Sequence, residues 1–204
     1  MARRQPPTER AQRAAAMQRQ ARAQERRRSL LVWGSAALVI AVIIGAVGYA
    51  IATRTDLSAV VEYEDLGRDH VAEAVEYEQD PPAGGVHNQA WWDCGIYTDP
   101  IPAHHAVHSL EHGAVWLTYH PDIPDAQRER LVELADQEFM MLSPNETQTD
   151  PVVATAWGRQ LGVESAQDER LELFVTEYKQ GPQSPEPGAA CTGGTTTDLA
   201  LGSQ

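Results

Sequence analysis

The chain has 204 residues and a formal net charge of −13, which is divided unevenly along its length. Residues 1–29 hold nine arginines against two glutamates, a net of +7, whereas residues 30–204 hold seven basic residues against 27 carboxylates, a net of −20. The acidic part would repel phosphates, which excludes nucleic-acid binding there. The length allows one domain of ordinary size with extensions.

Within the basic tail, residues 1–29, the stretch 8–28 is rich in Ala, Gln, Arg and Glu and has neither Gly nor Pro. This composition favours a helix with polar residues on every side. We expect the helix to lie in the cytoplasm beside a membrane, with its arginines near anionic lipid headgroups. Nucleic-acid binding is the alternative for such a basic run.

The next segment, Leu30–Ala52, contains no charged residue over 23 positions. As a helix it would be about 34 Å long, enough to cross a hydrocarbon core of about 30 Å. A cleaved signal peptide is the alternative, because Ala50-Ile51-Ala52 has the form of a cleavage site. The apolar run is longer than that of a signal peptide, which favours an uncleaved anchor.

The arginines before this span predict that the N-terminus stays in the cytoplasm and that residues 53–204 lie outside it. The chain has two cysteines, Cys94 and Cys191, and both follow the span. Thiols outside the cytoplasm tend to form disulfides, and two cysteines allow one pairing. We therefore expect a Cys94–Cys191 disulfide, with two free thiols as the alternative.

The part beyond the span divides into a linker (53–69), a domain (70–194) and a flexible tail (195–204). Alternation predicts short strands around Val60–Tyr63 and at Val71–Tyr77, and Pro and Gly predict a long loop up to residue 102. After Gly181 the composition predicts a solvated segment, except where pairing of Cys191 holds it against the domain. Between the loop and this segment we expect strands at 113–119, 139–142 and 152–157 and helices at 122–136 and 168–179. This order predicts an α+β fold, a small α/β sandwich with long loops.

All seven histidines lie beyond the span, and four of them fall within nine residues: His104, His105, His108 and His112. The segment from His108 to His112 matches H-x-x-E-H, the inverted zinc-peptidase motif. On a helix, its two histidines would lie one turn apart with Glu111 beside them. Such a pair can chelate a metal, and Glu111 can serve as a ligand or as a catalytic base.

His87, in the long loop, can add a third imidazole, so the predicted metal site is His87, His108, Glu111 and His112. Imidazole ligands suit zinc and copper. A metallohydrolase is a minor alternative, because Pro102 and Gly113 leave only about ten residues for the helix and no second metal-binding helix follows.

Histidines also satisfy buried polar groups or lie on the surface. We favour this interpretation for His104, His105 and His120. A thiol nucleophile at Cys94 is disfavoured, because Cys191 is available to pair with it. The tryptophans at 91, 92, 116 and 157 are expected to anchor the core and loops.

Four segments resemble a known family: YEQDPPAGGVHNQAWWDCGIY (77–97), VHSLEHGAVWLTYHPD (107–122), VVATAWGRQL (152–161) and QGPQSPEPGAACTGG (180–194). Together they resemble the DUF3105 domain of bacterial proteins. The resemblance implies an extracytoplasmic domain behind an N-terminal anchor, and it implies no particular activity.

The sequence thus predicts a single-pass membrane protein whose extracytoplasmic domain binds a transition metal through clustered histidines. We expect a binding role rather than catalysis. The main alternative is an interaction or structural module of the cell envelope without a metal.

Overall fold

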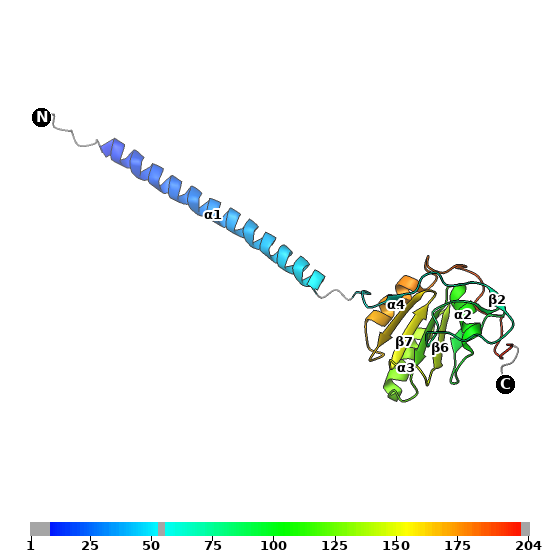
Figure 1. The fold of residues 1–204 in the computed structure, drawn as a ribbon. Coiled ribbons are helices and arrows are strands. Elements are labelled where there is room, and N and C mark those ends of the chain that lie inside the picture. The colour runs from blue at the N-terminus through cyan, green and yellow to red at the C-terminus, as the bar shows by residue number, and fades with distance from the viewer. Residues whose placement is uncertain (1–8, 53–55, 201–204) are drawn as a thin grey trace. The chain divides into compact units, whose positions relative to one another are not determined.

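The computed structural model describes residues 9–52 and 56–200 (Figure 1). The chain divides into two compact units, Met1–Arg54 and Thr55–Gln204. Parts of the predicted basic tail (1–8), linker (53–55) and C-terminal tail (201–204) lie outside the described residues.

The described part of the first unit is one continuous helix, α1 (Glu9–Ala52), of 44 residues. Its segment Met17–Tyr49 is long and apolar enough to cross a membrane, with a mean hydropathy of 2.6, and the protein buries none of its most apolar stretch. Large apolar side chains such as Leu31, Trp33 and Ile44 are exposed. These properties are typical of a membrane span or a signal sequence.

The second unit is built on a six-stranded mixed sheet with the order β1-β8-β7-β5-β6-β4. Strand β6 pairs in parallel with β5 and β4, whereas the pairs β5–β7, β7–β8 and β8–β1 are antiparallel. The strands are β1 (Val61–Glu62), β4 (Gly95–Ile96), β5 (Val115–Tyr119), β6 (Met140–Pro144), β7 (Val152–Ala156) and β8 (Arg159–Val163). A second, two-stranded parallel sheet is formed by β2 (His70–Val71) and β3 (His87–Asn88).

One face of the large sheet is covered by helices α3 (Asp125–Ala135) and α4 (Arg170–Tyr178) (Figure 1). Successive side chains of a strand point to opposite faces of the sheet. On the face covered by these helices, Leu117 of β5 packs in one cluster with Leu131 of α3 and Phe174 of α4. Helix α3 also makes the crossover that parallel pairing of β5 and β6 requires.

The other face of the sheet carries helix α2 (Ala103–Glu111). Trp116 of β5 and Met141 of β6 pack there against Leu110 of this helix. Helix α2 follows Pro102 and ends just before Gly113, whose φ of +94° is a conformation that glycine adopts at low cost.

Helix α2 is enclosed on all sides, since every residue from His104 to Glu111 is buried. Its outer side is covered by the long loop, where Ser109 Oγ donates a hydrogen bond to the carbonyl of Trp92 at 2.6 Å, and by the C-terminal segment, where Glu186 N–H donates to the carbonyl of Glu111 at 3.0 Å. Because the polar side chains of this helix are buried, they need hydrogen-bond partners within the domain.

The α+β class and the main elements are confirmed: the predicted segments at 113–119, 122–136, 139–142, 152–157 and 168–179 correspond to β5, α3, β6, β7 and α4. Strand β8 was not predicted; it follows β7 through Trp157 and Gly158, the latter with φ +66°. The strand predicted at Val71–Tyr77 is wrong beyond Val71. Tyr77 instead donates its hydroxyl to the carbonyl of Val86 at 2.8 Å.

The C-terminal segment is held against the domain through Cys191, as expected, but the prediction that the rest of it is solvated is wrong for Ser184 and Thr195. Ser184, Cys191 and Thr195 are buried. Cys94 and Cys191 form the expected disulfide, with a Cα–Cα distance of 5.4 Å. Next to the disulfide, Cys94 N–H donates to the carbonyl of Cys191 at 2.6 Å.

We predict that removing the disulfide by a Cys94→Ala, Cys191→Ala double substitution lowers the free energy of unfolding by about 2–5 kcal/mol, because the bond closes a long loop. Urea denaturation with and without a reductant measures the change. The reductant should destabilise the native protein and leave the double variant unaffected. Equal midpoints for the two proteins would contradict the prediction.

Candidate metal centre

Four side chains converge between the small sheet and helix α2: His70, His87, His108 and Glu111. Each offers one ligand atom, and these atoms all lie within 4.8 Å of one another. His87, His108 and Glu111 are buried, with 0%, 6% and 3% of their surface exposed, whereas the side chain of His70 is 43% exposed. The group therefore lies just below the protein surface.

The local structure explains why these residues meet. His70 and His87 are directly paired across β2 and β3. His108 and Glu111 are three residues apart on helix α2, so they share a face. The helix is joined to β3 by a hydrogen bond from His108 Nδ1 to the carbonyl of Asn88, at 2.8 Å. The three imidazole rings thus form a triangle with centroid separations of 4.7, 4.8 and 4.8 Å.

Two of the imidazoles have a defined tautomer. His87 Nδ1 lies 2.7 Å from the carbonyl oxygen of Gly85, and His108 Nδ1 lies 2.8 Å from that of Asn88. Because a carbonyl oxygen only accepts hydrogen bonds, Nδ1 carries the proton in both rings. In a neutral ring Nε2 then offers a lone pair, and backbone carbonyls bonded to the other nitrogen commonly orient metal-binding histidines in this way.

Burial favours the neutral form of both rings. It lowers the pKa of His108 to about 3, against a smaller opposing effect of the hydrogen bond to Asn88. Burial also lowers the pKa of His87, and there the carbonyl of Gly85 and the carboxylate of Glu111 act in the opposite direction. Both Nε2 atoms are therefore available as ligands at neutral pH.

The contact between His87 and Glu111 is the most informative one in the group. His87 Nε2 lies 3.0 Å from Glu111 Oε2, yet both atoms are buried and lack a hydrogen-bond partner among the described residues. An imidazole lone pair facing a carboxylate oxygen is repulsive, and each unsatisfied buried atom costs about 1–3 kcal/mol. A cation between the two atoms, either a metal ion or a proton, would remove this cost.

The spacing of the ligand atoms is close to that of a metal site. Two ligands bound at about 2.1 Å to a tetrahedral metal lie about 3.4 Å apart. The distance from Glu111 Oε2 to His87 Nε2 is 3.0 Å, and that to His70 Nε2 is 3.9 Å. Small side-chain movements would bring both to the required separation.

Three of the four residues predicted from the sequence are brought together, but His112 is not one of the group. Its ring lies beside that of His108, with centroids 4.6 Å apart. Helix α2 ends at Glu111, and His112 then turns toward the C-terminal segment: Nδ1 contacts the carbonyl of Ala190 at 2.6 Å, and Nε2 lies 4.0 Å from Glu186 Oε2. The two histidines of H-x-x-E-H thus serve different contacts.

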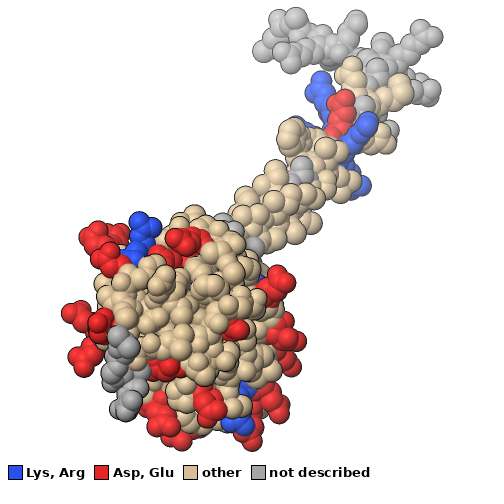
Figure 2. All heavy atoms as spheres, turned by 90° about the vertical axis from the view of Figure 1, so that its right-hand side faces the viewer, with Lys and Arg blue, Asp and Glu red and all other residues tan. Residues whose placement is uncertain are grey.

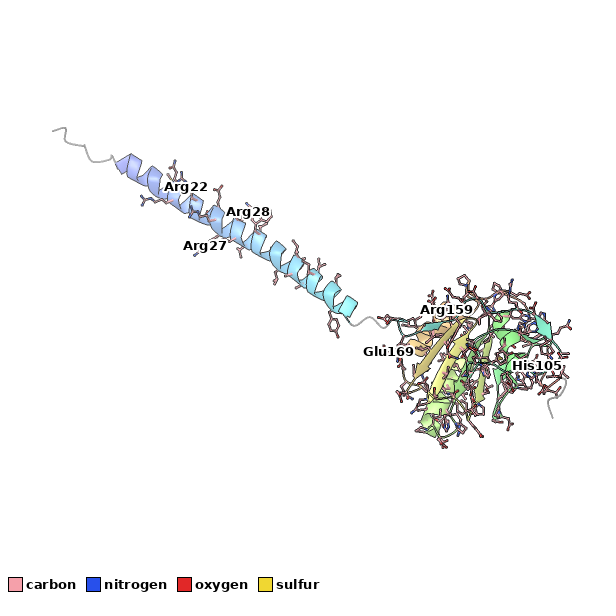
Figure 3. All side chains as sticks on the ribbon, in the orientation of Figure 1. Arg22, Arg27, Arg28, His105, Arg159 and Glu169 are labelled. Atoms are coloured by element: carbon pink, nitrogen blue, oxygen red, sulfur yellow. A yellow bond between two sulfur atoms is a disulfide. The ribbon has the colours of Figure 1, made fainter. Side chains whose placement is uncertain are left out.

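His104 and His105 form a second group with Asp198. His105, labelled in Figure 3, uses both ring nitrogens within the protein: Nδ1 donates to the carbonyl of Ala90 at 2.6 Å, and Nε2 accepts from Leu199 N–H at 3.0 Å. His104 Nε2 lies 3.0 Å from Asp198 Oδ1. These contacts join the C-terminal segment to helix α2. For His105, bonding to buried polar groups is the role favoured from the sequence.

A long apolar N-terminal helix, a mixed sheet, a disulfide and a buried histidine–carboxylate group define a membrane-anchored or secreted α+β domain with a candidate metal site. The chain belongs to the family described as "Protein of unknown function (DUF3105)", which matches residues 70–193. The match includes all four residues of the group. No curated protein and no solved structure matches the chain.

We predict that Glu111→Gln stabilises the protein in the presence of a chelator by about 1–2 kcal/mol, because the new amide N–H can donate to His87 Nε2. The free energy of unfolding from urea titrations in EDTA measures the change. As a control, Glu186→Gln removes an exposed carboxylate and should change stability by less than about 0.5 kcal/mol. Destabilisation by Glu111→Gln would show instead that the native pair is a salt bridge with protonated His87.

Proposed function

We propose that this domain binds one divalent transition-metal ion, zinc or copper, through His70, His87, His108 and Glu111. The observation that carries the proposal is the pair of buried acceptors, His87 Nε2 and Glu111 Oε2, which face each other at 3.0 Å without a hydrogen bond. A metal ion between them converts an unfavourable contact into two coordination bonds.

The ligand set supports zinc or copper over other metals. Three imidazoles and one carboxylate are ligands that zinc accepts in tetrahedral geometry, and imidazole also suits copper. Calcium and magnesium prefer oxygen ligands alone, and the group offers one carboxylate. The two cysteines are joined to each other, so neither is a free thiolate for metal binding or for nucleophilic chemistry.

Within this proposal Glu111 is a ligand rather than a catalytic base. The alternative function, an envelope module in which the same residues only hold the loop, would need a proton between His87 and Glu111. Burial lowers the pKa of His87, which disfavours a proton on that ring. The metal-bound interpretation requires no such proton.

We also propose that α1 remains attached as a membrane anchor and that its N-terminal end lies in the cytoplasm. Arg22, Arg27 and Arg28 project from the helix just before its apolar part (Figure 3). The positive-inside rule and attraction to anionic headgroups support this orientation. On the face of the domain visible in Figure 2, by contrast, acidic side chains outnumber basic ones.

We predict that the full chain, purified in detergent without a chelator, carries about one zinc or copper ion per molecule, and that His87→Asn and His108→Asn abolish binding. Asparagine retains a donor near the position of Nδ1 and removes Nε2. His112→Asn is the matched control, because it changes a buried neighbour outside the group and should leave the metal in place. Elemental analysis by mass spectrometry measures the metal content.

A metal-free native protein that also fails to take up added zinc or copper would contradict the proposal. If His112→Asn loses the ion and His87→Asn retains it, the ligands are instead the two histidines of the H-x-x-E-H motif, His108 and His112.

We predict that a C-terminal tag is digested when protease is added to intact cells from which any outer layer has been removed, while an N-terminal tag is protected. The charge difference across the apolar helix is the physical reason. Immunoblotting of both tags gives the readout. Protection of the C-terminal tag would refute the orientation.

A further inference from the structure

The four residues of the candidate metal centre are held very unequally. His87 and His108 are buried, and each is oriented by a hydrogen bond to a backbone carbonyl. Glu111 is buried on an enclosed helix. For His70 the structure shows no hydrogen bond from the ring to any described residue, and its side chain is 43% exposed.

The backbone that carries His70 is also the least constrained. Strand β2 has two residues and pairs with β3 alone in the small sheet, outside the six-stranded sheet that supports helix α2. A backbone bond from His87 N–H to the carbonyl of Asp69 at 3.1 Å also holds this segment. A short strand of this kind opens at low free-energy cost relative to the core.

The distances between the ligand atoms also indicate that His70 is the least constrained of the four residues. His87 Nε2 lies 3.0 Å from Glu111 Oε2, closer than two ligands of one metal, so a bound ion separates them slightly. His70 Nε2 lies 3.9 Å from the same oxygen, on the side that faces solvent. Three buried groups therefore define the metal position, and His70 closes it from outside.

We infer that His87, His108 and Glu111 hold the metal ion, and that His70 is an exchangeable fourth ligand whose position can be taken by a small anion from solution. The inference rests on the proposed function. Two histidines and one carboxylate suffice to hold a metal and leave coordination positions open. When His70 leaves, its lone pair returns to solvent and the entering anion donates one in its place.

The charge of the centre favours an anion at this position. A divalent ion with one carboxylate and two neutral imidazoles has a net charge of +1. In a partly buried site, such a charge attracts a monoanion more strongly than in bulk water. A small anion with an oxygen or nitrogen donor, such as a carboxylate or azide, therefore fits the open position.

The test uses the full chain in detergent, loaded with one equivalent of Cu²⁺ and titrated with azide, whose charge-transfer absorption reports binding to copper. We expect His70→Ala to retain one Cu²⁺ per molecule and to bind azide about 10-fold more tightly than the native protein, because the competing imidazole is gone. His120→Ala, which removes a partly exposed histidine on another part of the domain, should match the native protein.

Each other outcome is decisive. Loss of copper from His70→Ala to the same extent as from His87→Asn makes His70 an obligatory ligand and overturns the inference while the proposed function stands. Equal azide affinity in the native protein and His70→Ala also overturns it. If the native protein binds no copper at all, the proposed function itself fails.

Discussion

The 3.0 Å contact between His87 Nε2 and Glu111 Oε2 is the constraint around which the site is organised. When the His87 ring is neutral, both atoms are acceptors, because its single proton is held on Nδ1 by the carbonyl of Gly85. The protein buries them and gives neither a hydrogen bond among its described residues. A cation bound between the two atoms is the simplest way to stabilise such a contact.

The rest of the domain positions these two atoms. Helix α2 supplies Glu111 and is held on one side by the large sheet and on the other by the long loop and the C-terminal segment. Those two covering segments are joined by the Cys94–Cys191 disulfide and by hydrogen bonds between their backbones. Chain entropy lost through this crosslink in the unfolded state favours the enclosed arrangement. Structural histidines, above all His105, complete the enclosure.

Local patterns predicted most of the fold. The apolar run of β5, the spacing of apolar residues in α3 and α4, the disulfide and the family were all readable from the sequence, because each depends on neighbouring residues or on a unique pairing. Helical spacing also brought His108 and Glu111 together. His70 was missed because its position depends on parallel pairing of two very short strands, which leaves no periodic signal. His112 was included because it lies one turn after His108, and the pattern does not show that its Nδ1 bonds to the carbonyl of Ala190 in the C-terminal segment.

The central claim, that a metal ion lies between His87 and Glu111, is tested most directly by diffraction from crystals of the protein purified without chelators, recorded on both sides of the zinc and copper absorption edges. Our account predicts one anomalous peak at about 2.0–2.2 Å from His87 Nε2, His108 Nε2 and Glu111 Oε2. Crystals from protein supplied with both metals that show no peak there, with His87 Nε2 and Glu111 Oε2 in direct hydrogen-bonded contact, would contradict it.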